Sequence, residues 1–401
     1  MIQNNITSWL LSEAQNFPTV PELFDALIFQ LDKEGIPIVR ANISLPTLHP
    51  HVIVFIFKWR RKNLADLPIL STYLKGSRII DLEFGSVEES HYGYGVYDGD
   101  LHINSPFRDL ALGARRIHHN FLPNTTNLRY PVLNDLSKLG ATGYLALSIY
   151  FSDNKQSPTS WSTDKAGGFT EDDIRLIEGF LPALQLILEL RMSHHKNRNL
   201  LELYLGKQTG QRVLEGTIQR GDIKTIHSVI WYSDLRNFTK MSNELTEYEV
   251  IEKLNHYFEV VSDCIESAGG EILKFIGDAV LAIFPLENQD PKLLTRKAIE
   301  AAQNSFALLG TNEAGEPIQG VALHKGHIQY GNIGGKNRLD FTVIGNAVNL
   351  AARMESLCGK LGKEILISKE IANLFPEQTR SIGSFELKGF SDSKEIFEWI
   401  S

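Results

Sequence analysis

Two aspartates, Asp234 and Asp278, have the residue type and the sequence setting that point most directly to chemistry. Asp234 ends the apolar run 229–234, and Asp278 follows Gly277 between two further apolar runs. A Gly-Asp pair between β-type runs predicts a tight hairpin turn, with Asp278 at its tip and Asp234 at a strand end. If these strands are neighbours, two carboxylates converge at one end of a sheet. A two-magnesium phosphoryl-transfer site needs this arrangement.

Three separated segments together resemble the catalytic domain of class III nucleotidyl cyclases, and the resemblance covers roughly residues 222–401. They are residues 232–239 (Tyr-Ser-Asp-Leu-Arg-Asn-Phe-Thr), 274–278 (Lys-Phe-Ile-Gly-Asp) and 340–353 (Asp-Phe-Thr-Val-Ile-Gly-Asn-Ala-Val-Asn-Leu-Ala-Ala-Arg). They occur in the family's order. One residue departs from the pattern, because the family usually has Gly where Asn237 stands. Asn tolerates a positive φ better than other non-Gly residues, so we expect the turn to be kept.

The resemblance implies a role for each matching residue. Asp234, Asp278 and the backbone carbonyl of Leu235 would bind two Mg²⁺ ions, with Mn²⁺ as the alternative ion. Asn349 would orient the ribose, and Arg353 would stabilise charge on the reacting α-phosphate. The last two are four residues apart on a predicted helix and so share a face. A guanidinium suits a phosphate because it is planar, permanently charged and bidentate.

The resemblance also identifies the residues that would read the base. Lys274 offers only donors, so it matches the N1 acceptor of adenine and clashes with the N1–H of guanine. Thr342 aligns with the family's second base-contacting position, where its hydroxyl can accept from the 6-amino group. Guanylate cyclases have an acid and a small polar or thiol residue at these places. ATP is therefore the expected substrate. Further substrate-binding candidates are Phe238, Thr239 and Lys388.

The reaction that the resemblance implies is conversion of ATP to 3′,5′-cyclic AMP and pyrophosphate. In the family, one subunit supplies the metal aspartates and the other supplies the base-reading, Asn and Arg residues, which implies a head-to-tail homodimer. Two alternatives stay open. A guanylate cyclase is disfavoured by Lys274. A catalytically silent nucleotide-binding module is disfavoured by the intact set of Asp234, Asp278, Asn349 and Arg353.

The catalytic half, residues 229–401, has the element order of an α+β domain. A capping box at 246–249 opens a helix, and Asp290-Pro291 starts another that runs to about residue 309. We expect strands at 318–324 and 327–333, then a helix over 346–357. The order β-α-β-β-α-β is the ferredoxin-like arrangement.

The N-terminal region, residues 1–190, loosely resembles a GAF-type α/β sensor domain. We expect one helix over residues 1–16 and a second that begins at Pro21. Several strands follow, and then a closing helix that Thr170 caps. That last helix carries an apolar stripe, which is either the seam of a parallel dimer or a face packed on its own sheet. The stripe consists of Ile174, Ile177, Leu181, Leu184 and Leu188.

Residues 191–228 form a predicted helical linker and transducer element, interrupted at Gly206 and Gly210. It would pass a signal from the sensor to the catalytic dimer. The regulator is a small molecule or a protein that the sequence does not identify. A third hypothesis takes the N-terminal sensor as the primary functional domain and the catalytic half as its output, which is compatible with a cyclase.

Composition narrows the class of protein. The 401 residues are 43% hydrophobic and 22% charged, with a net charge of −8, as in soluble globular proteins. The sequence contains no basic stripe that would indicate a nucleic-acid partner. It also contains no apolar run that approaches the ~20 residues of a membrane helix. The two cysteines, Cys264 and Cys358, lack a metal-ligand spacing and suit the reducing cytoplasm, which is the expected location.

Overall fold

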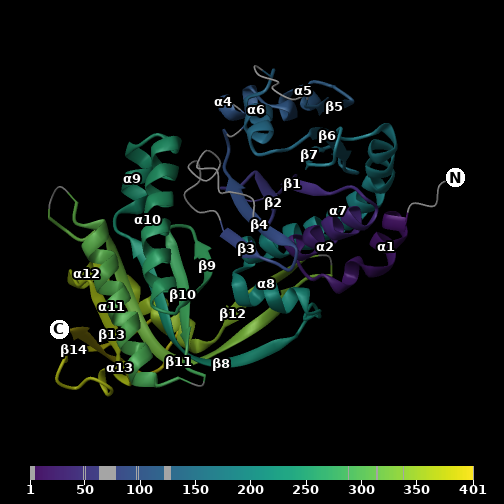
Figure 1. The fold of residues 1–401 in the computed structure, drawn as a ribbon. Coiled ribbons are helices and arrows are strands. Elements are labelled where there is room, and N and C mark those ends of the chain that lie inside the picture. The colour runs from purple at the N-terminus through teal and green to yellow at the C-terminus, as the bar shows by residue number, and fades with distance from the viewer. Residues whose placement is uncertain are drawn as a thin grey trace. The chain divides into compact units, whose positions relative to one another are not determined.

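The computed structural model describes residues 5–47, 49, 51–62, 78–95, 97, 99–121, 128–287, 289–312, 315–336 and 338–400. It divides into two compact units, Met1–Leu200 and Leu201–Ser401, called unit 1 and unit 2 below. Each unit is a largely antiparallel sheet covered by helices, which confirms the α+β class (Figure 1). In the part of the chain described, no helix is both long and apolar enough to cross a membrane.

Unit 1 contains a seven-stranded antiparallel sheet in the order β3-β4-β2-β1-β7-β6-β5. The strands are β1 (Ile38–Pro46), β2 (Val54–Arg61), β3 (Arg78–Asp81), β4 (Gly85–Tyr92), β5 (Arg116–Asn120), β6 (Gly143–Tyr150) and β7 (Gln156–Thr163). The helices are α1 (Asn5–Glu13), the 3₁₀-helix η1 (Ala14–Asn16), α2 (Val20–Lys33), α4 (Asp100–Ile103), α5 (Pro106–Ala111), α6 (Pro131–Lys138) and α7 (Glu171–Leu205). The predicted resemblance of this unit to GAF-type domains stays a prediction.

Helices α1, α2 and α7 bury one face of the unit 1 sheet. Strand residues such as Trp59 and Trp161 share one apolar cluster with these helices. All five residues of the predicted stripe on α7 belong to that cluster. The stripe therefore packs within its own unit, so the second of the two alternatives applies. Thr170 caps the helix as expected, because its hydroxyl accepts from the Asp173 amide at 3.2 Å.

Two glycines in the linker act differently from each other. Gly206, with φ of 82°, separates α7 from α8 (Lys207–Leu214). Gly210 lies inside α8, so the interruption predicted there is wrong. A Cβ at Gly210 would lie 2.9 Å from the backbone nitrogen of Glu202. The glycine is there because α8 approaches the end of α7 closely, and not because the helix breaks.

Unit 2 contains an eight-stranded sheet in the order β14-β15-β13-β11-β8-β10-β9, with β12 also paired to β11. The strands are β8 (Ile223–Leu235), β9 (Glu271–Ile276), β10 (Ala279–Pro285), β11 (Gln319–Gly334), β12 (Leu339–Ile344), β13 (Ile365–Ser368), β14 (Thr379–Phe385) and β15 (Lys394–Trp399). The other helices are α9 (Phe238–Glu244), α10 (Glu247–Ser267), α11 (Pro291–Leu309), α12 (Asn346–Leu361) and α13 (Lys369–Ala372).

The centre of unit 2 has the predicted ferredoxin-like order. The chain runs β8-α10-β9-β10-α11-β11, and the four strands lie in the order β11-β8-β10-β9. The two strands expected at 318–324 and 327–333 are one strand, β11. It pairs with β8 without a break, from Gln319 opposite Leu235 to Gly331 opposite Ile223. Residues 325–326, which were expected to separate the two strands, stay extended, and Gly326 leaves room for α12.

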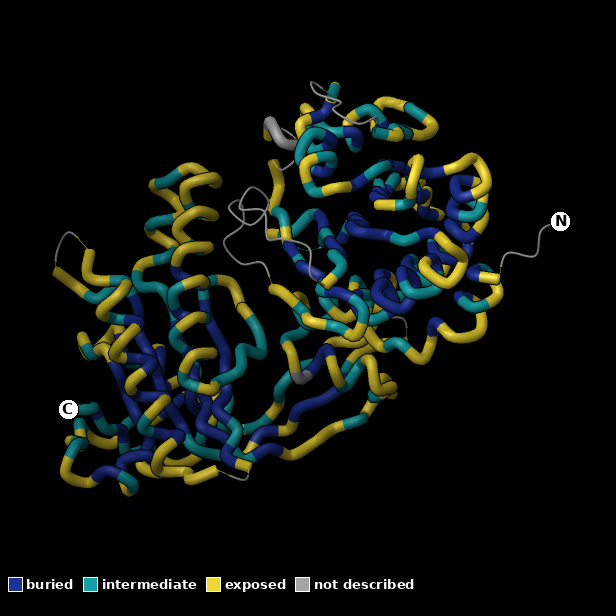
Figure 2. Tube along the Cα trace, in the orientation of Figure 1, coloured by how far each residue is buried: buried dark blue, intermediate teal, exposed yellow. Residues whose placement is uncertain are grey.

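Helices cover both faces of the unit 2 sheet. On one face, α10 and α11 share an apolar cluster with Val229 and Trp231 of β8. On the other, α12 packs on Ile230 through Ala351. Figure 2 shows that the central strands are largely buried. The alternation along β8 means that Asp234, an even-numbered residue, lies on the α12 face of the sheet.

Candidate functional site

The structure brings Asp234 and Asp278 together as the sequence predicts. Gly277 and Asp278 form the tight turn of the β9–β10 hairpin, in which Ile276 lies opposite Ala279 and Gly277 has a φ of 66°. Strand β10 pairs with β8, with Val280 opposite Ser233. The hairpin tip therefore lies beside the end of β8. The two carboxyl groups are within hydrogen-bonding reach of each other.

Asp234 is electrostatically strained in this position. Burial, the neighbouring Asp278 carboxyl and the charge of Glu355 raise the pKa of Asp234 to about 8. Its Oδ1 is buried and has no hydrogen-bond partner among the described residues. Buried polar atoms nearly always have a partner, so an orphaned carboxylate oxygen marks a place where another group binds.

Glu355 on α12 is a third acid beside this pair, and sequence reasoning missed it. The residue is 7% exposed, and burial raises the pKa of its carboxyl to about 7, with Asp278 adding to and Arg236 opposing the effect. A Cβ at Gly320, which lies opposite Asp234 on β11, would come 2.7 Å from the Glu355 Oε1. Its position in the sequence could have revealed it, because Glu355 is one helical turn from Ala351 and so lies on the face of α12 that packs on the sheet.

Arg236 supplies positive charge next to the acids, and sequence reasoning assigned it no role. Its Nη2 donates to the carbonyl oxygen of Lys363 at 2.6 Å, and it lowers the pKa of Glu355. Gly359 leaves room for the guanidinium, because a Cβ there would lie 2.9 Å from Nη1. The cation partly offsets the repulsion that three neighbouring carboxyls create.

This donor set fits a hard divalent ion. Asp234 and Asp278 offer carboxylate oxygens, and Leu235, the last residue of β8, adds a candidate carbonyl. Within the described ranges, no group of three or more His, Cys, Asp or Glu side chains is placed to hold a metal. Mg²⁺ is commonly bound by one or two carboxylates, with substrate phosphates completing its shell. The residues present therefore suit an ion that arrives with a phosphate ligand.

Asn237 keeps the turn that follows Asp234. It has φ 59° and ψ 26°, the left-handed conformation, and precedes α9. This confirms that Asn can stand where the family usually has Gly. The candidates Phe238 and Thr239 are the first residues of α9, a helix without buried residues. Both follow directly from the strand end that carries Asp234.

The two base-reading candidates lie on strands that contact each other. Lys274 on β9 forms an ion pair with Asp340 on β12, with 2.5 Å between Nζ and Oδ2. Thr342 is two residues further along β12 and so lies on the same strand face as Asp340. Asp340 is a further residue that sequence reasoning did not assign. It fixes the Lys274 ammonium beside the strand of Thr342.

Asn349 and Arg353 are both exposed on α12. The described part of the chain shows no hydrogen bond or ion pair for either side chain. They are one helical turn apart and share a face, as predicted. Lys388 is exposed in the segment between β14 and β15, and no contact joins it to the other candidates among the described residues.

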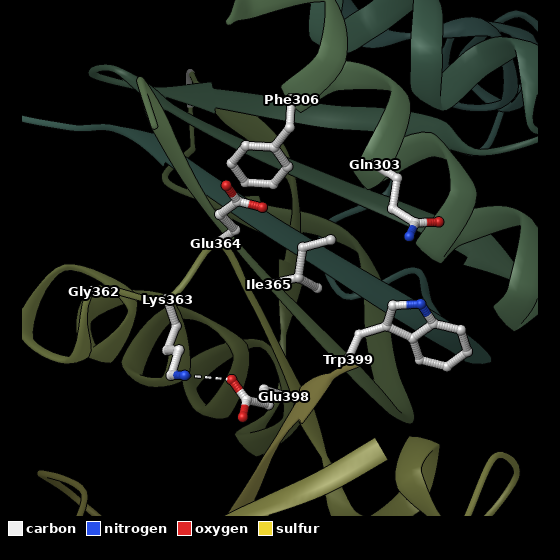
Figure 3. A pocket seen from close by; sticks show the side chains of 8 residues that line it. All are labelled: Gln303, Phe306, Gly362, Lys363, Glu364, Ile365, Glu398 and Trp399. Carbon is white, nitrogen blue, oxygen red and sulfur yellow. Dashed lines mark ion pairs between the residues drawn. The ribbon is translucent and has the colours of Figure 1, made fainter. Parts of the chain in front are cut away.

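A hollow of about 490 Å³ in unit 2 lies elsewhere (Figure 3). The dashed line in the figure is the 2.5 Å ion pair between Lys363 and Glu398. The lining residues are Gln303, Phe306, Gly362, Lys363, Glu364, Ile365, Glu398 and Trp399. None of them is a predicted site residue. The candidate catalytic site is therefore at the strand ends that carry Asp234 and Asp278, and not in this hollow.

The raised pKa values of Asp234 and Glu355 predict how stability depends on pH. The folded chain keeps protons that the unfolded chain releases above about pH 4, so the free energy of unfolding falls as pH rises from about 5 to 8. We expect Asp234→Asn to flatten this slope and to raise the urea midpoint at pH 8. The measurement is urea unfolding, followed by tryptophan fluorescence, at pH 6 and pH 8 in EDTA.

Two controls accompany this measurement. Glu300→Gln, an exposed acid on α11, should unfold as the wild type does at both pH values. Mg²⁺ in place of EDTA should raise the pH 8 midpoint of the wild type and not that of Asp234→Asn. Equal midpoints for Asp234→Asn and wild type at pH 8 would show that the buried carboxyl carries no strain.

Comparison with known proteins finds a family model that matches most of unit 2. Residues 223–400 match the family model described as "Adenylate and Guanylate cyclase catalytic domain". The "Adenylate cyclase" of Anabaena cylindrica is 33% identical over 191 residues, which are 45% of this chain and 38% of that protein. The "Adenylate cyclase, terminal-differentiation specific" of Dictyostelium discoideum is 35% identical over 190 residues, which are 45% of this chain and 9% of that protein. The chain thus spans well under half the length of these relatives.

Among solved structures, the adenylyl cyclase CyaB from P. aeruginosa is 28% identical to this chain. That alignment covers 45% of this chain and 96% of the solved one, with a TM-score of 0.38.

Proposed function

We propose that this protein, whose residues 223–400 form a catalytic domain of the adenylate and guanylate cyclase family, is an adenylate cyclase. It converts ATP to 3′,5′-cyclic AMP and pyrophosphate. The observation that carries the proposal is the convergence of Asp234 and Asp278 at the strand ends, with an Asp234 oxygen buried and unpartnered. The names of the relatives from Anabaena cylindrica and Dictyostelium discoideum support the choice of reaction.

In the reaction, the ribose 3′ oxygen forms a bond to the α-phosphorus while the bond from that phosphorus to the pyrophosphate oxygen breaks. The hydroxyl proton is released. Asp234, Asp278 and the Leu235 carbonyl would hold two divalent ions, Mg²⁺ or Mn²⁺. When bound, such ions lower the pKa of the 3′ hydroxyl and neutralise phosphate charge. Arg353 donates to the α-phosphate, where negative charge develops, and Asn349 holds the ribose.

Recognition of adenine rests on Lys274 and Thr342. The Lys274 ammonium donates to adenine N1, and the Thr342 hydroxyl accepts from the 6-amino group. The ion pair with Asp340 positions Lys274 before the nucleotide arrives. Phe238 and Thr239 at the start of α9 and Lys388 are assigned to the triphosphate. Guanylate cyclase activity has less support, because an ammonium cannot accept from guanine N1–H.

The exposure of Asn349 and Arg353 supports a site shared between two copies of the chain. Among the described residues of their own chain, neither side chain has a hydrogen-bond or ion-pair partner, although other residues of α12 pack in an apolar cluster. In a head-to-tail homodimer, each copy would offer these two side chains to the Asp234–Asp278 pair of the other. Two equivalent sites follow from the symmetry.

Regulation by unit 1 is part of the same proposal. Helix α7 begins in unit 1 and ends at Leu205, directly before α8. Within unit 2, α8 contacts the catalytic strands: Thr209 shares a hydrogen bond with Tyr330 of β11, and Arg212 lies over the Phe341 ring of β12. Phe341 precedes Thr342, so a shift of α8 would act on a base-reading strand.

The first test of the function is a product assay. The purified chain is incubated with ATP or GTP, in Mg²⁺ or Mn²⁺, and the nucleotides are separated by chromatography. We expect cyclic AMP from ATP, little cyclic GMP, and a loss on the order of 100-fold or more in Asp278→Asn because a metal ligand is removed. Glu300→Gln is the matched control. Absence of cyclic product from both the full chain and residues 201–401 would contradict the proposal.

Mixing two inactive variants tests the shared site. Asp278→Asn and Arg353→Ala should each be inactive alone. Random pairing of equal amounts makes half of the dimers mixed, and each mixed dimer has one intact site, so activity should return to about a quarter of wild type. Cyclic AMP formation after mixing is the measurement. Activity that stays at the level of the separate variants would mean that each site lies within one chain.

Exchange of the base-reading residues tests nucleotide preference. Lys274→Glu combined with Thr342→Cys should shift the ratio of ATP use to GTP use by on the order of 100-fold or more, because each mismatch leaves a buried polar group unpaired. The ratio of kcat/KM for the two nucleotides measures it. Lys388→Glu, away from the base, should leave the ratio unchanged. An unaltered ratio in the double variant would remove the assignment of both residues.

A further inference from the structure

A row of charged and polar side chains crosses the unit 1 sheet on the face opposite α2 and α7. We call it the polar stripe, and it consists of Arg40, Asn42, Lys58, Arg60 and Glu88. Across the strands, Arg40 lies opposite Arg60, Asn42 opposite Lys58, and Lys58 opposite Glu88. Their chain neighbours Ala41, Trp59 and Val87 point into the apolar cluster on the other face. The stripe is therefore a built feature of β1, β2 and β4.

The stripe is buried. Arg40, Asn42 and Lys58 are each 7% exposed, and Glu88 is 9% exposed. Burial lowers the pKa of Arg40 and of Lys58, which shows that the surroundings oppose their positive charge. A buried ion without a partner of opposite charge costs several kcal/mol, so such ions are rare unless they are paired.

Positive charge exceeds negative charge in the stripe. Glu88 is its one carboxylate, and it already accepts from Lys58 at 3.3 Å and from Arg60 at 3.2 Å. The Ser90 hydroxyl donates to it as well, at 3.2 Å. Asp135 on α6 acts on Arg40 from a distance, but it lies 3.8 Å from Lys138. In the ranges that the structure describes, no ion pair reaches Arg40.

Unpartnered atoms occur where charge is unbalanced. Among the described residues, the Nε of Arg40, the Nε of Arg60 and the Oδ1 of Asn42 are buried without a hydrogen-bond partner. The strand beside β1 adds one neutral hydroxyl, because Ser162 lies opposite Arg40. Ser160, opposite Asn42, already shares a hydrogen bond with Tyr144. The two Nε–H groups and the Ser162 hydroxyl are donors that suit a small anion with two or more oxygens. The Asn42 Oδ1 is an acceptor and so is not a ligand for the anion.

We propose that the polar stripe of unit 1 binds a small anion that carries a carboxylate or a phosphate group, with Arg40 as its main ligand. The anion supplies the negative charge that Glu88 alone does not provide, and it accepts from the guanidinium groups. Arg suits this role because its planar fork matches either oxyanion. The site is independent of the proposed cyclase activity, since all of its residues belong to unit 1.

Calorimetry of the full chain tests the site. After dialysis against chloride, sodium succinate and sodium phosphate are compared with sodium chloride at equal ionic strength. Above the dissociation constant, an anion that binds should raise Tm by about 3–5 °C for each tenfold increase in concentration. If only succinate raises Tm, the ligand carries a carboxylate. If phosphate raises Tm, the ligand carries a phosphate group. Arg353→Ala should keep the rise, because it removes a phosphate contact of unit 2 only.

Three variants decide whether the stripe is responsible. Arg40→Met should abolish the rise and, without added anion, should melt above wild type because an unbalanced buried cation is gone. Lys58→Met should melt below wild type, since it breaks the pair with Glu88. Arg60→Met, at the partly exposed end of the stripe, should weaken the response. The proposal would be overturned if neither anion raised Tm above its value in chloride. It would also be overturned if Arg40→Met kept the rise in Tm.

Discussion

Repulsion between carboxyl groups at the end of β8 is the constraint on which the candidate site depends. Asp234 and Asp278 are held within reach of each other by two strand pairings, and Glu355 approaches from α12. Acids so close, and partly removed from water, cannot all be ionised without a counter-charge. The fold therefore provides either protons, which the raised pKa values of Asp234 and Glu355 describe, or a bound cation.

The surrounding structure holds this strained arrangement from both faces of the sheet. On the α12 face, Gly320 and Gly359 leave room for Glu355 and Arg236, and a side chain at either position would separate the cation from the acids. On the other face, the Ser233 hydroxyl bonds to Tyr257 of α10 at 2.9 Å. This contact fixes the residue next to Asp234. Rigid support of this kind is what a preorganised metal site requires.

Local chemistry made part of the structure predictable from the sequence. The Gly277–Asp278 turn, the capping residues of α7 and α10, and the position of Asp234 follow from rules that span a few residues. The errors arose where contacts from distant residues determine the backbone. The break expected between strands at 325–326 does not occur, because pairing with β8 keeps β11 continuous. Gly210 was expected to interrupt a helix, yet it serves the close approach of α8 to Glu202. The helix face of Glu355 is a local signal that its carboxyl is buried. Its approach to Asp234 and Arg236 depends on Gly320, a residue 35 positions from Glu355, and no local pattern shows that approach.

The two units carry unbalanced buried charge of opposite sign, and the same reasoning applies to both. In unit 2 the excess is negative and has an orphaned acceptor, the Oδ1 of Asp234; in unit 1 it is positive and has orphaned donors on Arg40 and Arg60. The Lys274–Asp340 pair is a useful contrast, because it is balanced and partly exposed. Such a pair contributes little to stability, so Lys274 can exchange Asp340 for a nucleotide at small cost. An excess of buried charge has no second partner of opposite charge among the described residues that could take the place of a ligand. The free energy that it costs in the empty protein becomes binding energy for a ligand of the opposite charge.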